Sequence, residues 1–360
     1  MSKTLKYIKH NPLSVLLIAF PLSLLAEWGE WGAIWVFVLS AIGMIPMAGY
    51  IGSATEALAA YTGPKIGGLL NATLGNAAEL IITLVAIQAG LLDLVKASIT
   101  GSIIGNLLLV LGAAMLLGGL KNGLQHFDRR QAGTHSTLLT LAILALVIPS
   151  LFSHYIGSEG SVKVEMLSLG VAAVMIVLYV LGLVYSLRAS QSPLAYQSKH
   201  DHGEPEMPRK MAFIILGLST LGVVILSELL VGAVDVVVVD LGLSEFFLGI
   251  ILIPIVGNVA EHLVAVTVAR SNQMDLSVEI AVSSSLQIAL FVAPLLVFVS
   301  LLMGNPLTLI FNQFELIALG AGVLITALVA SDGESNWLEG AALLAVYLIL
   351  SLAFFLMPTF

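Results

Sequence analysis

The chain has 360 residues, of which 59% are hydrophobic and only 10% charged, and its mean hydropathy is +1.05. Soluble domains carry about 25% charged residues, so this composition excludes an ordinary water-exposed surface. The net charge of −8 without a basic patch argues against a nucleic-acid partner, and the absence of cysteine excludes disulfides and thiolate metal sites.

Apolar runs long enough to cross a bilayer as helices recur along nearly the whole chain. They lack the alternating pattern of lipid-facing strands, which favours helices over a barrel. The sequence therefore predicts an all-α membrane protein with about eleven transmembrane helices. The predicted spans are residues 12–26, 33–60, 64–89, 91–119, 136–153, 164–187, 211–238, 244–270, 275–302, 313–330 and 336–357.

The first apolar run follows three lysines, as in a signal peptide, but Leu24 and Ala26 do not form a small-x-small cleavage site. We interpret residues 1–32 as a cytosolic N-terminus followed by a retained first span. With this orientation, twelve of the fourteen Lys and Arg residues fall on the cytosolic side, as the positive-inside rule requires. The two exceptions are Lys96 and Lys163.

Residues 189–210 form the only long hydrophilic stretch, and they divide the chain near its middle. The stretch contains three acidic residues together with His200 and His202. It is interpreted as a solvated acidic linker on the cytosolic side, although its histidines and acids are also compatible with a sensor of cations or pH. The division predicts one five-helix repeat in residues 33–188 and a second in residues 211–360.

The two predicted repeats share a Gly-Asn-x-Ala-Glu segment, called the GNxxE motif below. It occurs at residues 75–79 and again at residues 257–261, which lie 182 positions later. Because each repeat has an odd number of spans, the second repeat enters the membrane from the opposite side. Inverted repeats of this kind are typical of secondary transporters, whose sites lie at the repeat interface near the bilayer midplane.

The glutamates of the two motifs, Glu79 and Glu261, lie well inside apolar segments and hence near the middle of the bilayer. A carboxylate there is costly unless it faces a partner, an ion or water. Asn76 and Asn258 precede the glutamates by three residues and share their helix faces. Carboxylate and amide oxygens are ligands that suit Ca²⁺, so these four residues are the predicted metal ligands.

Two carboxylates at one site also provide a mechanism for exchange. When both are ionised they repel each other, which raises their affinity for protons. Either a divalent cation or protons relieve this repulsion, but the two cannot fully occupy the same oxygens together. Competition for these oxygens is sufficient to couple Ca²⁺ movement in one direction to H⁺ movement in the other.

A second set of polar residues supports the ion pathway less specifically. Small polar side chains on the spans after the motifs either supply oxygens or join helices by hydrogen bonds. Two further glutamates either line the cytosolic access route or are simply solvated, and the histidine after the second motif is a proton relay or a packing group. These residues are Ser102, Asn106, Ser283, Ser284, Gln287, Glu56, Glu228 and His262. Acidic residues near outer span ends, including Glu315, are assigned to a hydrated surface.

Enzyme functions have no support in the sequence. The chain has no HExxH zinc motif, no Gly-rich phosphate loop before a lysine and no nucleotide-binding domain of soluble composition. We expect no cofactor, because Ca²⁺ and H⁺ are the transported ions. An intramembrane hydrolase is a remote alternative, and a cation channel with acidic rings is another.

The paired motifs resemble the two α-repeats of the Ca²⁺/H⁺ exchanger (CAX) family, within the cation/Ca²⁺ exchanger superfamily. The resemblance includes the flanks Gly67–Thr73 and Gly249–Val256, the extra first span and the acidic linker. It implies alternating access, with Glu79 and Glu261 shared by Ca²⁺ and H⁺. Sodium/calcium exchangers typically place a proline before the repeat glutamate, and neither motif has one, so the resemblance favours protons over sodium.

The sequence therefore predicts a Ca²⁺/H⁺ antiporter, with Na⁺/Ca²⁺ exchange or exchange of another cation for H⁺ as the alternative. Its expected partners are Ca²⁺, protons and the lipid bilayer, and the resemblance permits a homo-oligomer. The compact chain indicates the plasma (inner) membrane of a prokaryote, with a cytosolic N-terminus.

Overall fold

The computed structural model describes residues 12–158, 160–188 and 207–357. Within these ranges the chain is almost entirely helical, and its only strands are the two-residue pair β1 (Gln125–His126) and β2 (Glu334–Ser335), which are antiparallel. Most of the polar linker and the N-terminal lysines lie outside the described ranges. The chain divides into two compact units, and each unit takes residues from both sides of the linker.

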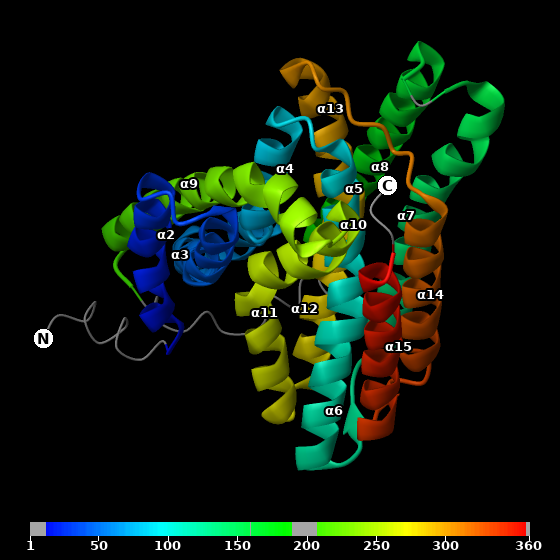
Figure 1. Cartoon of the computed structure of the whole chain (residues 1–360). Coiled ribbons are helices and arrows are strands. Elements are labelled where there is room, and N and C mark those ends of the chain that lie inside the picture. Colours follow the sequence, from blue (N-terminus) through cyan, green and yellow to red (C-terminus); the bar gives the residue numbers. More distant parts are fainter. Residues whose placement is uncertain (1–11, 159, 189–206, 358–360) are drawn as a thin grey trace, which may run out of the picture. The chain divides into compact units, whose positions relative to one another are not determined.

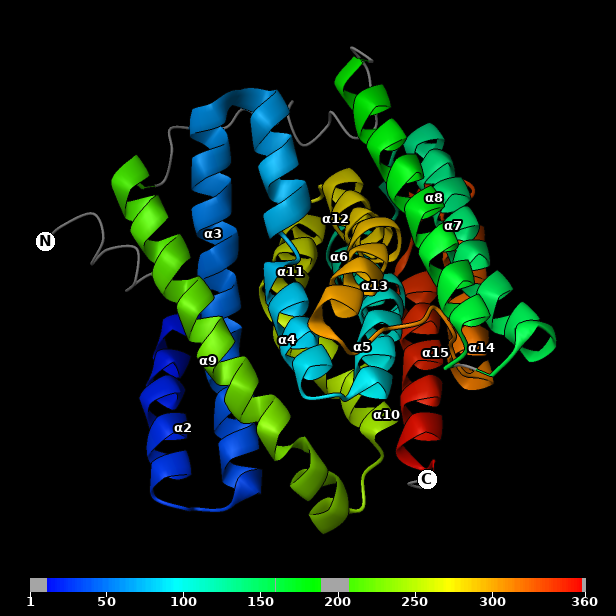
Figure 2. The same cartoon turned by 90° about the horizontal axis from the view of Figure 1, so that it is seen from above.

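Unit 1 comprises Met1–Ala89, Leu181–Leu243 and Val256–Ala260. Its described helices are η1 (Pro12–Ile18), α2 (Ala19–Trp28), α3 (Ala33–Leu74), α4 (Ala77–Gln88) and α9 (Arg209–Leu241). In Figure 2 the ribbon of α3 rises beside α9 and then turns back on itself before it reaches α4. The 42-residue α3 therefore contains two arms.

Small residues allow the helices of unit 1 to pack closely. Ala57 on α3 and Ala212 on α9 are buried in one cluster, and Ile51, Ala78 and Val223 form another that joins α3, α4 and α9. Alanine at a crossing lets two backbones approach, which is how helices gain packing contacts without a hydrophobic driving force in lipid.

Unit 2 comprises Gly90–Val180, Ser244–Ile255 and Glu261–Phe360. Figure 1 shows α6 and α15 side by side within it, where Gly340 contacts the backbone of Leu116 and has no room for a side chain. The helices of unit 2 are α5 (Leu92–Ile104), η2 (Gly105–Val110), α6 (Leu111–Asn122), α7 (Arg129–Ile156), α8 (Val162–Arg188, which continues into unit 1), α10 (Glu245–Phe247), η4 (Leu248–Leu252), α11 (Ile253–Arg270, whose middle belongs to unit 1), α12 (Met274–Gln287), η5 (Ile288–Val292), α13 (Ala293–Met303), α14 (Gln313–Val329) and α15 (Trp337–Phe355).

Polar residues in the loops fix where several of these helices begin. Asp128 caps α7 by accepting hydrogen bonds from the backbone N–H groups of Arg130 and Gln131. Asn312 and Asn336 begin α14 and α15 with capping boxes completed by a glutamate three residues later. These caps satisfy backbone donors that have no partner inside the helix.

Eight helices in the described part of the chain are long and apolar enough to cross a membrane. They are Ala33–Thr62, Leu92–Asn122, Arg129–Ile156, Val162–Tyr185, Arg209–Leu241, Glu245–Arg270, Met274–Met303 and Trp337–Phe355. The three other predicted spans correspond to shorter apolar helices, Leu13–Trp28, Ala77–Gln88 and Gln313–Val329. The helical membrane class is thus supported, but the count of eleven full-length spans is not confirmed.

The predicted span 64–89 is wrong as a single helix. The second arm of α3 ends at Leu74, Gly75 and Asn76 form a turn, and α4 begins at Ala77. Glycine and asparagine both have low helix propensity, which permits the break at this point.

Candidate functional site

The sequence had predicted that the first GNxxE motif lies inside a continuous helix. In the structure the motif lies instead at the junction of α3 and α4. Asn76 is the cap residue of α4, with φ −97° and ψ 26°, and its carbonyl accepts the first helical hydrogen bond, from Leu80 N, at 3.0 Å. Glu79 consequently belongs to the first turn of α4. The unpaired N–H groups at a helix N-terminus favour a negative charge there.

Both polar residues of this first motif are buried in unit 1. Asn76 is 2% exposed and Glu79 is 4% exposed. The hydroxyl of Thr83, one turn later on α4, donates to the backbone carbonyl of Glu79 at 2.7 Å. The side chain of Glu79 is thereby placed on a firmly hydrogen-bonded first turn.

The middle of α11 packs against Glu79 within the same unit. A Cβ atom added to Gly257 would lie 3.2 Å from Oε1 of Glu79, and one added to Gly49 on α3 would lie 3.4 Å from Cβ of Ala260. Glycine at position 257 therefore provides the space that the Glu79 carboxylate occupies. Two segments 178 residues apart in sequence, each from one copy of the motif, meet at this contact.

The second GNxxE motif lies inside the uninterrupted helix α11, as predicted. Pro254 stands in the first turn of this helix, and the π-helical segment η4 precedes it. Asn258 is 2% exposed, and Glu261, three residues later, is half-buried. The spacing places the amide and the carboxylate on one face of the helix.

In unit 2, Glu261 belongs to a chain of hydrogen bonds. The side chain of Ser284 on α12 hydrogen-bonds to Glu261, and Nδ2 of Asn106 donates to Oγ of Ser284 at 3.0 Å. Asn106 lies in the first predicted repeat, whereas Ser284 and Glu261 lie in the second. Within the described residues, the second carboxylate oxygen of Glu261 is buried without a hydrogen-bond partner.

The other polar residues predicted on these helices are also located in unit 2. Ser102 and Ser283 are buried, and among the described residues their hydroxyl oxygens have no hydrogen-bond partner. Gln287 is half-buried directly before the π-helical segment η5, and Asn106 lies within the π-helical segment η2. Single π-helical turns inside α-helices occur frequently at functional sites.

The remaining predicted residues lie in both units. Glu56 on α3 and Glu228 on α9 are exposed side chains of unit 1. His262 is half-buried in unit 2, and its Nε2 has no hydrogen-bond partner in the part of the chain described here.

In the described ranges, no three His, Asp or Glu side chains are grouped so that they alone could hold a metal ion. A bound cation would therefore need amide, hydroxyl or backbone oxygens as well. The buried asparagines and serines near the glutamates can supply such oxygens, which are typical Ca²⁺ ligands.

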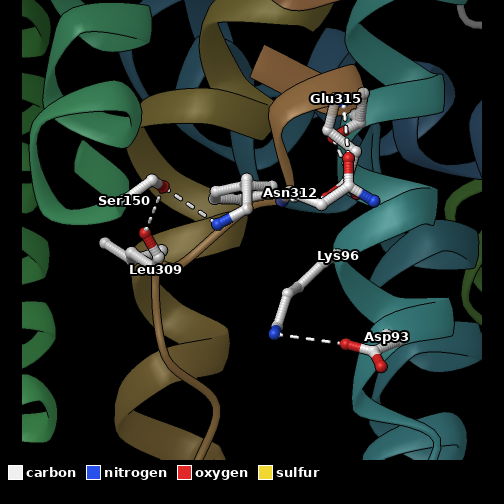
Figure 3. A network of polar contacts seen from close by, with 8 residues as sticks. Asp93, Lys96, Ser150, Leu309, Asn312 and Glu315 are labelled. Atoms are coloured by element: carbon white, nitrogen blue, oxygen red, sulfur yellow. Dashed lines mark hydrogen bonds and ion pairs between the residues drawn. The ribbon is translucent and has the colours of Figure 1, made fainter. Parts of the chain in front are cut away.

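The sequence did not reveal a buried polar network in unit 2, shown in Figure 3. Glu315 was assigned to a hydrated surface, but it is 1% exposed, accepts from Asn312 N at 2.9 Å and contacts Oγ1 of Thr100 at 3.4 Å. Lys96 is 6% exposed and pairs with Asp93 at 3.2 Å. The Asn-x-x-Glu spacing of Asn312 and Glu315 before an apolar run is typical of a capping box, and it could have predicted the hydrogen bond between them.

Comparisons with known proteins agree over nearly the whole chain. Residues 32–188 and 211–356 match the family of sodium/calcium exchanger proteins. The Ca²⁺/H⁺ antiporter of Aphanothece halophytica is 45% identical over 357 residues, which cover 95% of this chain and 96% of that protein. The Ca²⁺/H⁺ antiporter ChaA of Bacillus subtilis is 43% identical, and the match covers 96% of this chain and 100% of that protein. The solved structure of native YfkE has a TM-score of 0.84 at 41% identity, with 96% of this chain and 100% of that one covered.

Proposed function

The chain belongs to the family of sodium/calcium exchanger proteins, within its group of Ca²⁺/H⁺ exchangers, and from this premise we propose that it is a secondary active Ca²⁺/H⁺ antiporter. The observation that carries the proposal is the doubled GNxxE motif, whose two glutamates and two asparagines are buried or half-buried among polar side chains. In this proposal Ca²⁺ moves out of the cytosol while protons move in.

The proposed ligands are Glu79, Asn76, Glu261 and Asn258. Their oxygens are the type that Ca²⁺ prefers, and only the carboxylates among them can also take up protons. Ser284 and Asn106 hold Glu261 through hydrogen bonds, and Ser102, Ser283 and Gln287 supply further oxygens along the pathway. The proposal that one ion uses both glutamates rests on the sequence repeat, in which corresponding motif residues are 182 positions apart.

The exchange mechanism follows from competition at the carboxylates. A bound Ca²⁺ neutralises the negative charge, and protons neutralise it equally well once Ca²⁺ has left. A site that is neutral in both loaded states can change its exposed side, whereas a doubly ionised empty site is costly inside the membrane. This difference prevents a leak and couples the two fluxes.

We also propose the architecture that this mechanism needs. It consists of an initial span (residues 1–32) and two inverted five-helix repeats (33–188 and 211–360), which together make eleven segments. Movement of the repeats exposes the site to one side of the membrane and then to the other. The linker 189–210 connects the repeats on the cytosolic side. Localisation in a prokaryotic plasma membrane with a cytosolic N-terminus, and assembly as a homo-oligomer, complete the proposal. No cofactor is required.

The decisive experiment uses purified protein in sealed vesicles that are loaded at acidic pH and diluted into ⁴⁵Ca²⁺ at higher external pH. We expect the outward proton gradient to drive Ca²⁺ accumulation. Glu79→Gln and Glu261→Gln should each reduce uptake to that of protein-free vesicles, because glutamine can neither ionise nor exchange a proton. Glu27→Gln, at an exposed helix end, is the matched control and should transport normally. Full uptake by both single variants would refute the assignment of the site.

Two alternatives are separated in the same vesicles. Ca²⁺ accumulation driven by a sodium gradient at clamped pH would indicate Na⁺/Ca²⁺ exchange. A cation channel cannot accumulate Ca²⁺ against its electrochemical gradient, so accumulation at zero membrane potential would exclude it.

A further inference from the structure

A small polar pocket of unit 2, lined by no residue of the GNxxE motifs, lies between the N-terminal parts of α7 and α12. Asp128, Gln131 and His135 line it from the α7 side, and Asp275 and Glu279 line it from α12, with three apolar side chains between them. Its volume is about 10 Å³, close to the space that one water molecule needs.

The two titratable groups deepest in this pocket are almost completely buried. His135 is 1% exposed and Glu279 is 2% exposed. Among the described residues, Nε2 of His135 has no hydrogen-bond partner. Gln131 is close enough to interact with the Glu279 carboxylate, but neither Glu279 oxygen makes a hydrogen bond of regular geometry. Buried polar groups without hydrogen-bond partners lower the stability of a helix bundle, so their presence here calls for a functional explanation.

The rim of the pocket differs from its interior because its carboxylates already have backbone partners. Asp128 caps α7, and Asp275 accepts a hydrogen bond from the backbone N–H of Asp128. Asp128 is exposed and Asp275 is half-buried. The rim is therefore fixed and negative, and it attracts cations toward the two buried groups behind it.

Other charges near this end of unit 2 do not line the pocket. All of them are exposed, so water screens their effect on the buried pair. They are Lys121 on α6, His126 on β1, Arg129 and Arg130 on α7, Arg270 on α11 and Glu334 on β2. His135 and Glu279 are both groups that bind protons, and no three His, Asp or Glu side chains among the described residues are grouped so that they could hold a metal ion.

The pocket is connected to the motif through α12. Glu279 and Ser284 are five residues apart on this helix, which corresponds to about 7.5 Å of rise. Ser284 in turn hydrogen-bonds to Glu261. Ser283, with its buried hydroxyl, lies between them along the helix and one turn beyond Glu279.

We propose that His135 and Glu279 form a second proton-binding site, through which the protons exchanged for Ca²⁺ enter or leave unit 2. The proton moves between a Glu279 oxygen and Nε2 of His135, so that a neutral acid and a neutral imidazole interconvert with a carboxylate and an imidazolium. The pocket that both side chains line has room for about one water molecule. This role in transport rests on the proposed antiport, whereas the binding of a proton does not.

The proton site is tested first without transport. In protein carrying Glu79→Gln and Glu261→Gln, infrared difference spectra are recorded between neutral and acidic pH, with and without Glu279→Gln. We expect a carboxylic-acid band that disappears in the triple variant and keeps its intensity when Glu334→Gln is introduced instead. The absence of any carboxylic-acid band that depends on Glu279 would overturn the proposal, even if the chain transported no Ca²⁺.

The role in transport is tested by comparing two fluxes in vesicles. We expect Glu279→Gln to slow proton-driven Ca²⁺ uptake about tenfold, less than the 10²–10⁴ that a positioned proton carrier contributes, because water reaches the rim. Ca²⁺/Ca²⁺ isotope exchange, which moves no net proton, should be affected much less, and His135→Gln should act in the same direction. Equal losses in both fluxes, or no loss in either, would overturn the relay, whereas absent uptake by the wild-type chain would refute the antiport itself.

Discussion

The two copies of the GNxxE motif have nearly the same sequence but different structures. The first lies at a break between two helices of unit 1, with Glu79 in a first helical turn. The second lies inside α11, with Glu261 held by Ser284 of unit 2. The comparison shows that a duplicated motif conserves its chemistry more closely than its backbone, since in each copy the amide and the carboxylate remain three residues apart.

The segments that precede the two motifs also differ. The second motif continues a helical segment that begins at Glu245 and includes the π-helical turn η4 and Pro254. At the position equivalent to Pro254 the first copy has Ala72, and helix α3 ends two residues later.

The largest effect is expected at the contact between the first motif and α11. Gly257→Val should abolish Ca²⁺ transport, because its side chain would occupy the position of the Glu79 carboxylate, and Gly257→Ala should weaken transport less. Gly217→Ala is the matched control, since a Cβ on that glycine of α9 meets nothing within 4 Å. Uptake assays in vesicles measure all three. Normal uptake by Gly257→Val would contradict the close packing of Glu79.

A smaller loss is expected when the hydrogen-bond chain of the second motif is cut. Ser284→Ala removes the partner of both Glu261 and Asn106, and the loss of one such bond should weaken the apparent Ca²⁺ affinity about tenfold, or about 1.4 kcal/mol. Ser285→Ala is the control, because its hydroxyl bonds only to backbone carbonyls. The concentration dependence of Ca²⁺ uptake distinguishes them, and equal affinities would argue against the chain.

A third prediction tests whether the helix break is needed. Gly75 has helical angles, so Gly75→Ala fits the backbone and should stabilise the protein by about 1 kcal/mol through helix propensity. By favouring a continuous helix, it should also slow transport severalfold. Gly232→Ala on α9 should give a similar gain in thermal stability without slower transport. If Gly75→Ala transports at the wild-type rate, the break has no role in the transport cycle.

The smallest effect on transport is expected in the network of Figure 3. Asn312→Ala removes the cap of α14 and should lower the free energy of unfolding by about 1 kcal/mol. The apparent Ca²⁺ affinity should not change, because this cap is not among the proposed ligands. A thermal unfolding curve paired with an uptake assay checks both statements.

The sequence was sufficient to predict the helical membrane class, the family and the residues to examine, because long apolar runs and a doubled acidic motif are strong signals. The break after Leu74 was not predicted, since hydropathy is equally high on both sides of Gly75 and Asn76. The burial of Lys96 and Glu315 was also missed. Charged residues near span ends are usually hydrated, and only tertiary contacts such as that of Glu315 with Thr100 reveal the exceptions.

The composition of the compact units has a consequence for how such a chain arose and how it can be divided. Each unit combines segments from before and after the linker, and Gly101 on α5 directly contacts the backbone of Ile250 in η4. If the ancestor was a half-length protein, then after gene fusion each copy came to contribute segments to both compact units. Neither half expressed alone would then contain a complete core, and co-expressed halves should recover function only by assembling together.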